Sequence, residues 1–206
     1  MSNNKVKLVG SVVSEPEYSH KVCGEKFYIF YLSISRRSGT VDKIPITVSE
    51  RLVYIDKIKI GERFEIEGQF RSHNRIENDK SRLILSVFCS SIISAENEND
   101  KNVIEIEGYI CKQPIYRETP LGRDICDLLI AVNRPYGKSD YIPCIAWGRN
   151  AIYASNFEVG VKVFVKGRVQ SREYSKKIDE GMEEIGTAYE VSIIQIREEK
   201  EDGNAD

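Results

Sequence analysis

Apolar and polar residues alternate with a period of two along most of the chain. In the first half the alternating runs cover residues 6–12, 29–34, 44–48 and 64–70, and a fifth run, 82–93, follows a variable loop. A period of two is typical of strands that bury one face. The pattern therefore predicts five strands within the first 93 residues.

One helical stretch is predicted between the third and fourth strands. Residues 50–59 end at Gly61, and residues 148–158 of the second half end at Gly160. Helices often end at a glycine. Five strands with a single short helix between the third and the fourth form the pattern of an OB-fold barrel.

The sequence is an internal duplication. Residues 5–75 align with residues 103–174 at a separation of 98 positions, which one inserted residue later changes to 99. The matched pairs are Gly10 with Gly108, Pro16 with Pro114, Tyr18 with Tyr116, Gly24 with Gly122, Arg36 with Arg134, Gly39 with Gly137, Asp42 with Asp140, Pro45 with Pro143, Arg51 with Arg149, Tyr54 with Tyr153, Gly61 with Gly160, Gly68 with Gly167 and Ser72 with Ser171. We expect Gly10 and Gly108 to form bulges that bend the first strand of each copy.

The duplication predicts an all-β chain with short helices, folded as two tandem five-stranded OB-fold barrels. Residues 1–93 form the N-terminal barrel, and residues 102–197 form the C-terminal barrel. The polar stretch SAENENDK at 94–101 is the expected linker. Residues 198–206 are expected to be an acidic disordered tail, since residues 178–206 hold ten acidic and two basic side chains.

The outer face of the second barrel is predicted to carry exposed aromatic rings. Alternation along the third strand gives one face with Tyr141, Pro143, Ile145 and Trp147 and another with Ile142, Cys144 and Ala146. The first copy has Lys43, Pro45, Thr47 and Ser49 opposite Ile44, Ile46 and Val48. The polar set of the first copy indicates that the Tyr141 face is the exterior. Packing of Tyr141 and Trp147 in the core is the alternative.

The fourth strand adds positive charge to this exterior. Valines at 163, 165 and 169 alternate with Lys162, Phe164, Lys166, Arg168, Gln170, Arg172 and Tyr174. The first copy has Glu65 and Glu67 where Phe164 and Lys166 lie in the second. Residues 134–177 hold nine basic and three acidic side chains, whereas residues 36–78 hold nine and seven. The two copies are therefore expected to differ on their surfaces.

Aromatic rings interleaved with cations predict a surface for single-stranded nucleic acid. Bases stack on rings for about 1–3 kcal/mol each, while Lys and Arg contact phosphates. A duplex hides its base faces. The expected phosphate contacts are Arg134, Lys138, Arg149, Lys162, Lys166, Arg168, Arg172, Lys176 and Lys177.

The composition and charge of the chain argue against several other kinds of protein. The 30 basic and 32 acidic residues give a net charge of −2, which argues against coating duplex DNA by bulk charge. The longest aliphatic run, residues 128–132, is too short for a membrane span, and the first residues lack a secretory apolar segment. We expect a cytoplasmic protein with no membrane contact. The five cysteines form no CxxC, so we expect small buried side chains, with neither disulfides nor a metal site.

Several phrases resemble the bacterial single-stranded DNA-binding protein family. They are NKVKLVG and EIEGQFRS in the first copy, and VNRPYGKSDYIPCIAWGRNA, VFVKGRVQSREYSKK and TAYEVSIIQI in the second. The resemblance implies base stacking on Tyr136, Tyr141, Trp147 and Tyr174, to which the strand pattern adds Phe164. The same positions in the first copy hold Ser38, Lys43, Ser49 and Arg75.

The resemblance also implies an activity and an assembly. We expect sequence-independent binding and protection of single-stranded DNA in replication, recombination or repair, close to the nucleoid. The C-terminal barrel is expected to carry most of the contact, with weaker N-terminal contacts from Arg36, Arg37, Lys43, Arg51 and Arg71. The family usually assembles four barrels, which for this chain implies a homodimer, for which a free first-strand edge is one route. Members recruit replication and repair proteins through an acidic tip ending in Pro-Phe, whereas this chain ends in REEKEDGNAD.

An enzyme and a protein-binding scaffold are the two other functional classes. An enzyme is not expected, because the chain has only His20 and His73, both in polar turn-like stretches, and no nucleophile or phosphate-loop motif. No cofactor is expected either. A tandem OB-fold scaffold that binds protein, such as a primosome accessory subunit, stays open as the alternative.

Overall fold

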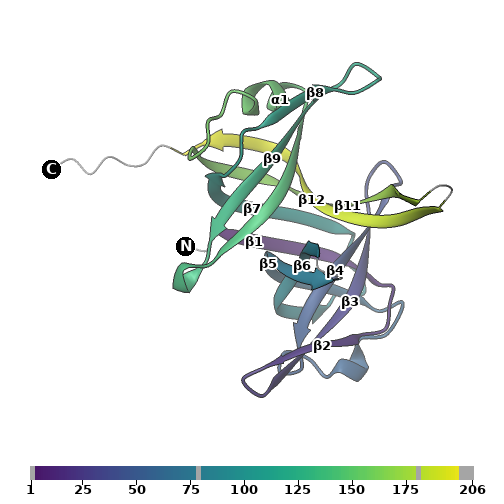
Figure 1. Cartoon of the computed structure of the whole chain (residues 1–206). Helices are drawn as coiled ribbons and strands as arrows, with labels where there is room; N and C mark the ends of the chain where they lie inside the picture. The colour runs from purple at the N-terminus through teal and green to yellow at the C-terminus, as the bar shows by residue number, and fades with distance from the viewer. Residues whose placement is uncertain (1–2, 78–79, 180–181, 200–206) are drawn as a thin grey trace.

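The computed structural model describes residues 3–77, 80–179 and 182–199. They form two β-barrels that lie one above the other and share a continuous twelve-stranded sheet (Figure 1). The predicted fold class, an all-β chain of two OB-fold barrels, is confirmed.

The first barrel contains six strands and one short 3₁₀ helix. In chain order they are β1 (Asn4–Val12), β2 (Glu17–Val22), β3 (Glu25–Ser35), β4 (Val41–Ser49), η1 (Ile55–Lys57), β5 (Arg63–Glu77) and β6 (Lys80–Ser94). The second barrel repeats the order with β7 (Lys101–Ile110), β8 (Ile115–Glu118), β9 (Asp124–Asn133), η2 (Pro135–Gly137), β10 (Ser139–Trp147), α1 (Arg149–Ala154), β11 (Lys162–Asp179) and β12 (Met182–Glu198). The five predicted strands are present in each copy, and β2 and β8 are additional hairpin partners of β3 and β9.

The helix prediction is wrong for the first barrel and too long for the second. Residues 50–59 contain only the three-residue η1, whereas the counterpart of this stretch contains the six-residue α1. The first stretch is rich in β-branched side chains, which lose χ1 freedom in a helix. In the second stretch Ala151 and Ala154 are small enough to be fully buried against the barrel.

Strand alternation places the core as predicted. Ile44, Ile46 and Val48 of β4 are fully buried, as are Ile142 and Ala146 of β10. Each fully buried aliphatic side chain of this size contributes about 1.5–3 kcal/mol to folding. Three of the five cysteines, Cys89, Cys126 and Cys144, are buried in this way, but Cys23 is exposed and Cys111 is half-buried, so the prediction of five buried cysteines is wrong for these two.

The prediction of bulges at Gly10 and Gly108 is wrong. The register of β1 with β5 is continuous through Gly10, and that of β7 with β11 is continuous through Gly108. The register shifts lie at Tyr18/His20, Glu67/Gly68, Lys166/Gly167 and Lys177/Asp179. Gly10 and Gly108 are required for a different reason, the close approach of another strand. A Cβ at Gly108 would lie 2.5 Å from the carbonyl oxygen of Ala131, where β7 meets β9 to close the barrel.

The two barrels are joined edge to edge by β1 and β7. These strands pair antiparallel over six residues, and Val6 lies opposite Ile104, its own counterpart in the duplication. The pairing is therefore symmetric about equivalent positions. Because both first-strand edges are used inside the chain, the expectation that a free first-strand edge joins two chains is wrong.

Two reciprocal contacts, which we call the Asp–Ser clasps, hold the barrels in register. Asp42 of β4 accepts a hydrogen bond from the backbone N–H of Ser171 at 2.9 Å, and the Ser171 hydroxyl accepts one from the N–H of Lys43. Asp140 of β10 accepts from the N–H of Ser72 at 2.7 Å, and Ser72 in turn accepts from the N–H of Tyr141. The clasps explain why these aspartates and serines match between the two copies.

The stretch between the barrels is anchored rather than free. Ala95 is buried, and Asp100 forms an ion pair with Arg63 at 2.7 Å. The Asp100 carboxylate also accepts a hydrogen bond from the N–H of Ser35. These bonds outweigh the effect of burial, which alone would raise the pKa of Asp100, and the net result is a pKa below its usual value. At the other end of the chain, β12 includes Glu198, and residues 200–206 of the predicted tail lie outside the described residues.

Candidate nucleic-acid interface

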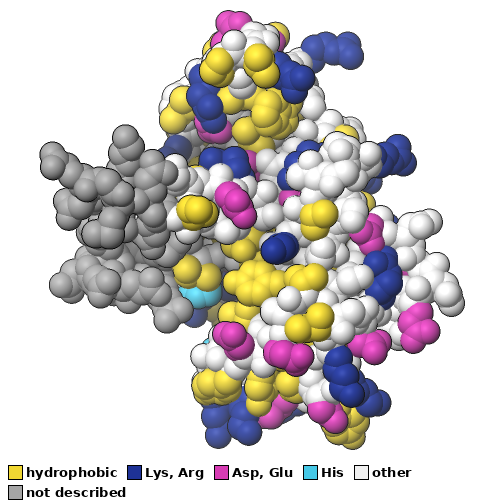
Figure 2. Space-filling view, turned by 90° about the vertical axis from the view of Figure 1, so that its right-hand side faces the viewer, with side chains coloured by type: hydrophobic (Ala, Val, Ile, Leu, Met, Phe, Trp, Pro, Cys, Tyr) yellow, Lys and Arg dark blue, Asp and Glu magenta, His cyan; other side chains and the backbone are white. Residues whose placement is uncertain are grey.

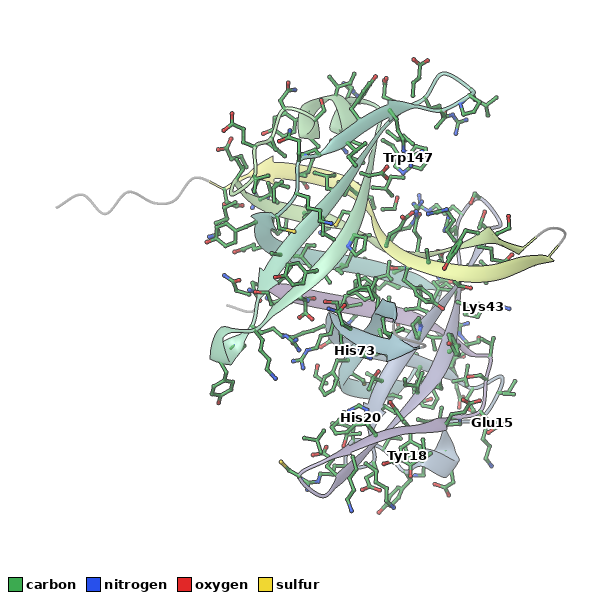
Figure 3. All side chains as sticks on the ribbon, in the orientation of Figure 1. Glu15, Tyr18, His20, Lys43, His73 and Trp147 are labelled. Atoms are coloured by element: carbon green, nitrogen blue, oxygen red, sulfur yellow. The ribbon has the colours of Figure 1, made fainter. Side chains whose placement is uncertain are left out.

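The outer face of β10 carries two exposed rings. Tyr141 is 47% exposed and Trp147 is 41% exposed, while the alternate residues face the core. Figure 3 shows Trp147 on the upper barrel, at the end of β10 beyond the barrel seam. The exposed rings agree with the predicted orientation of this strand. The middle of the same face does not, because Ile145 is 6% exposed.

A third ring stands on the β9–β10 turn. Tyr136 has a positive φ of 65° and is fully exposed. The turn is closed by a hydrogen bond of 2.7 Å from the N–H of Arg134 to the carbonyl oxygen of Lys138. The short Pro135–Gly137 helix thus presents the ring at the tip of a hairpin, free of intramolecular packing.

The other two predicted stacking residues are partly covered. The Tyr174 ring packs across Gly186 on the neighbouring strand, where a Cβ would lie 2.6 Å from the ring. The guanidinium of Arg197 lies 4.0 Å from the centre of the Phe164 ring, so one face of Phe164 is already occupied by a cation. Tyr174 and Phe164 are both half-buried, whereas Tyr136, Tyr141 and Trp147 are exposed.

Several predicted phosphate contacts are engaged by carboxylates. The ion pairs are Lys166 with Glu105 at 2.7 Å, Arg134 with Asp140 at 3.2 Å and Arg172 with Glu190 at 3.9 Å. Part of the charge of these cations is therefore neutralised within the chain. Glu190 is itself buried and accepts a hydrogen bond from Gln170 at 2.6 Å.

Other cations remain available beside the rings. Lys138 follows Tyr136 on the turn, and Arg149 follows Trp147 at the start of α1. Both are exposed and have no ion pair among the described residues. Lys162 is half-buried, and the side chains of Lys176 and Lys177 lie outside the described part of the chain. On the side shown in Figure 2, hydrophobic, basic and acidic side chains are interspersed.

The corresponding face of the first barrel is closed. Thr47 and Ser49 are each 5% exposed, and the Thr47 hydroxyl is hydrogen-bonded to Ser86 at 2.9 Å. Val41 and Lys43 are exposed at the start of this face of β4, and the backbone of Lys43 lies against β11 of the other barrel (Figure 3). Arg51 contacts Glu25 at 3.5 Å.

A set of stacked rings fills this closed face, and the sequence reasoning missed it. His20 is stacked on Phe27 at 4.9 Å between ring centres, and Phe27 lies 5.6 Å from Phe88. Arg71 lies over the Phe88 ring at 4.4 Å. The contact of His20 with Phe27 follows from the β2–β3 hairpin, whose turn could have been recognised from Gly24. The contribution of Phe88 comes from β6 and has no local signal.

The part of the chain that the structure describes shows no other class of site. No group of three or more His, Cys, Asp or Glu side chains there is placed to hold a metal ion. The described helices are all too short or too polar to cross a bilayer.

Known proteins are similar to this chain in sequence. Residues 101–196 match the family model described as the single-strand binding protein family. Single-stranded DNA-binding protein 3 of Listeria innocua is 31% identical over 109 residues, covering 50% of this chain and 67% of that protein. Single-stranded DNA-binding protein A of Bacillus subtilis is 30% identical over 111 residues, covering 50% of this chain and 63% of that protein. The aligned region thus spans about two thirds of these relatives.

A solved structure is similar over both barrels. The crystal structure of the wild-type single-stranded DNA binding protein from Thermus aquaticus aligns with 96% of this chain and 93% of its own, with a TM-score of 0.77 and 19% identity. At this identity the likeness concerns the fold, and it extends through both barrels.

Proposed function

Because the chain belongs to the single-strand binding protein family, we propose that it binds single-stranded DNA without regard to base sequence and protects it during replication, recombination or repair. The observation that carries the proposal is the set of exposed rings on the second barrel: Tyr136, Tyr141 and Trp147. Large aromatic side chains exposed on the exterior of a barrel are unfavourable unless a binding partner covers them. The proposal involves binding alone, with no catalytic step and no cofactor.

Aromatic side chains are proposed to stack on bases, and basic side chains are proposed to contact phosphates. Every base has a flat face, so stacking on Tyr136, Tyr141 and Trp147 tolerates any sequence and contributes about 1–3 kcal/mol per base. Lys138 and Arg149 are exposed and follow Tyr136 and Trp147 by two residues, which supports a role in contacting phosphates. Tyr174 extends the surface along β11, and Phe164 contributes least because Arg197 covers it.

The first barrel acts mainly as a scaffold in this proposal. The stacking positions of the second barrel correspond to Ser38, Lys43 and Ser49 in the first, and the face around Ser49 is filled by its own rings. Of its predicted cations, Arg36 is bound to Asp42 and Arg71 lies over Phe88. Lys43 and Arg37 stay exposed as weak contacts.

Trp147 is the only tryptophan, and its fluorescence therefore tests the proposal directly. Titration with oligo-dT at low salt is expected to quench the emission, and a duplex of the same length is expected to leave it unchanged. Emission that stays constant at micromolar oligo-dT would favour the alternative of a protein-binding OB-fold scaffold.

We further propose a homodimer, which brings together four barrels. With the β1 and β7 edges already paired, the available surface is the outer face of the joined sheet. A groove of about 770 Å³ crosses it, lined by residues of β1, β5, β6, β7 and β11. Lys7 is paired with Glu65 at 2.6 Å and Lys166 with Glu105 at 2.7 Å, while Lys5, Arg71 and Lys101 keep the lining of the groove net positive. Native mass spectrometry should give twice the chain mass of 23.5 kDa, and a monomer at micromolar concentration would contradict the dimer.

A further inference from the structure

A second pocket lies at the seam between the barrels. Its volume is about 490 Å³, and both barrels line it. The first barrel contributes Arg36 and Arg37 from the β3–β4 turn and Asp42 from β4. Asp100 comes from the connection between the barrels, and Arg168 comes from β11 of the second barrel.

The carboxylates of this seam pocket already have partners. Arg36 binds Asp42 through two hydrogen bonds of 2.7 Å and 2.6 Å, and Asp42 also accepts the clasp bond from Ser171. Asp100 is paired with Arg63. Among the residues that the structure describes, no carboxylate lies within ion-pair distance of Arg37 or Arg168. The pocket therefore holds two uncompensated positive charges.

Arg168 is the group that most needs a partner. Its Nε atom is buried and makes no hydrogen bond in the described structure. Burial and, after it, the charge of Arg36 lower the pKa of Arg168, as expected for a guanidinium held beside a like charge. A buried charged donor without a partner is costly, and a guanidinium binds phosphate oxygens through two parallel bonds.

The other side of the seam offers an internal comparison. There Arg71 occupies a similar place beside Arg134 and Asp140, and burial followed by the charge of Arg134 lowers its pKa. Arg71 nevertheless has partners, because it donates two hydrogen bonds to Gln69 and lies over the Phe88 ring. The Nε atom of Arg134 on that side is also buried without a hydrogen bond, but it lies 3.2 Å from Oδ2 of Asp140. Arg168 differs in that it has neither a hydrogen bond nor an ion pair among the described residues.

We propose that the seam pocket binds a backbone phosphate of single-stranded DNA where the strand passes from the second barrel to the first. This rests on the proposed function. Arg168, Arg172 and Tyr174 lie at alternate positions of β11, beyond its bulge, and so share one face with the stacking surface. Ser171 of the same strand contacts the backbone of Lys43, which places the first barrel next along the path. Arg168 and Arg37 then hold one phosphate from opposite sides of the seam.

The experiment measures binding of fluorescein-labelled (dT)30 to the full chain by anisotropy across a salt series. Arg168→Met is expected to weaken binding about tenfold and to make the slope of log K against log salt shallower by about 0.7, the value for one phosphate contact on a single strand. Lys59→Met removes the same charge from the exposed surface after η1 and should change neither quantity. An unchanged slope for Arg168→Met would overturn the proposal.

A conservative variant separates binding from folding. Arg168→Lys keeps the charge and is expected to keep the wild-type slope, so a loss of slope in Arg168→Lys as large as in Arg168→Met would contradict a charge-mediated contact. If the wild-type chain itself fails to bind (dT)30, the proposed function fails. If the wild type binds and Arg168→Met binds equally well, only the seam site fails.

Oligonucleotide length tests the path of the strand. One OB-fold covers about 4–16 nucleotides, so (dT)8 can be held by the second barrel alone, whereas (dT)30 has to continue beyond it. Arg168→Met should weaken the complex with (dT)30 and leave that with (dT)8 within twofold of the wild type. Equal losses on both lengths would overturn the crossing from one barrel to the other.

Discussion

Trp147 keeps 41% of its surface exposed at the end of β10, where a base can reach the indole ring. Trp147→Ala is expected to weaken binding of oligo-dT by about 1–3 kcal/mol, because one stacked base loses its platform. Isothermal titration calorimetry measures the difference. Tyr54→Ala, which removes an exposed ring beside η1 of the first barrel, serves as the control and should bind like the wild type. Equal losses in both variants would mean that Trp147 is not a specific contact.

Residue orientation was predictable where local periodicity decides it. The alternation along β10 puts Tyr141 and Trp147 on one face because successive side chains of a strand point to opposite faces. The polar residues at the matching positions of the first copy then identify that face as the exterior. The partners of the cations were not predictable. The ion pair of Arg134 with Asp140 forms only when β9 and β10 have paired. The hydrogen bond from the N–H of Ser72 to Asp140 forms only when the two barrels have docked. A count of basic residues cannot distinguish a neutralised guanidinium from a free one.

At the scale of elements, the Asp–Ser clasps make a strong prediction. Asp140 is 1% exposed and receives both the guanidinium of Arg134 and the N–H of Ser72. Asp140→Ala leaves both donors buried without an acceptor and should cost about 3–5 kcal/mol of unfolding free energy. Urea denaturation followed by circular dichroism measures it. Glu96→Ala, at an exposed carboxylate between the barrels, should be neutral, and a cost below 1 kcal/mol for Asp140→Ala would contradict the role of the clasp.

The connection between β6 and β7 predicts a dependence of stability on pH. The pKa of Asp100 is lowered in the folded chain, so its contribution is present above its ordinary value of 3.8 and is lost as the pH falls through the folded pKa. Asp100→Ala should therefore reduce the unfolding free energy at pH 7 by about 1–3 kcal/mol. The difference from the wild type should shrink as urea titrations are repeated below pH 4. A difference that stays constant down to pH 2 would show that Asp100 acts through packing alone.

The helices show where prediction of elements reaches its limit. The stretches before Gly61 and Gly160 have the same helix-end signal, and both glycines adopt positive φ as that signal requires. Only the second stretch forms an α-helix, because Ala151 and Ala154 fit closely against the barrel. The number and order of the main strands were predictable from alternation, whereas helix length depended on packing against residues far away in sequence.

At the scale of the whole molecule, the barrels should unfold together. β1 pairs with β7 over six residues, and two clasps add contacts between β4 and β11 and between β10 and β5. Trp147 reports on the second barrel, while far-ultraviolet circular dichroism reports on both. The two urea transitions are expected to coincide. A separate earlier or later transition by circular dichroism would show that the barrels are independent.

The symmetric pairing of Val6 with Ile104 also has a consequence for how mutations affect the two halves. Two separate identical subunits change together, since one mutation appears in both. Within a single polypeptide each half can acquire its own substitutions, so Lys43 in the first half coexists with Tyr141 at the matching position of the second. The association of the two barrels is intramolecular, so dilution does not weaken it. A cell that makes few copies of this chain still obtains a complete pair from each one.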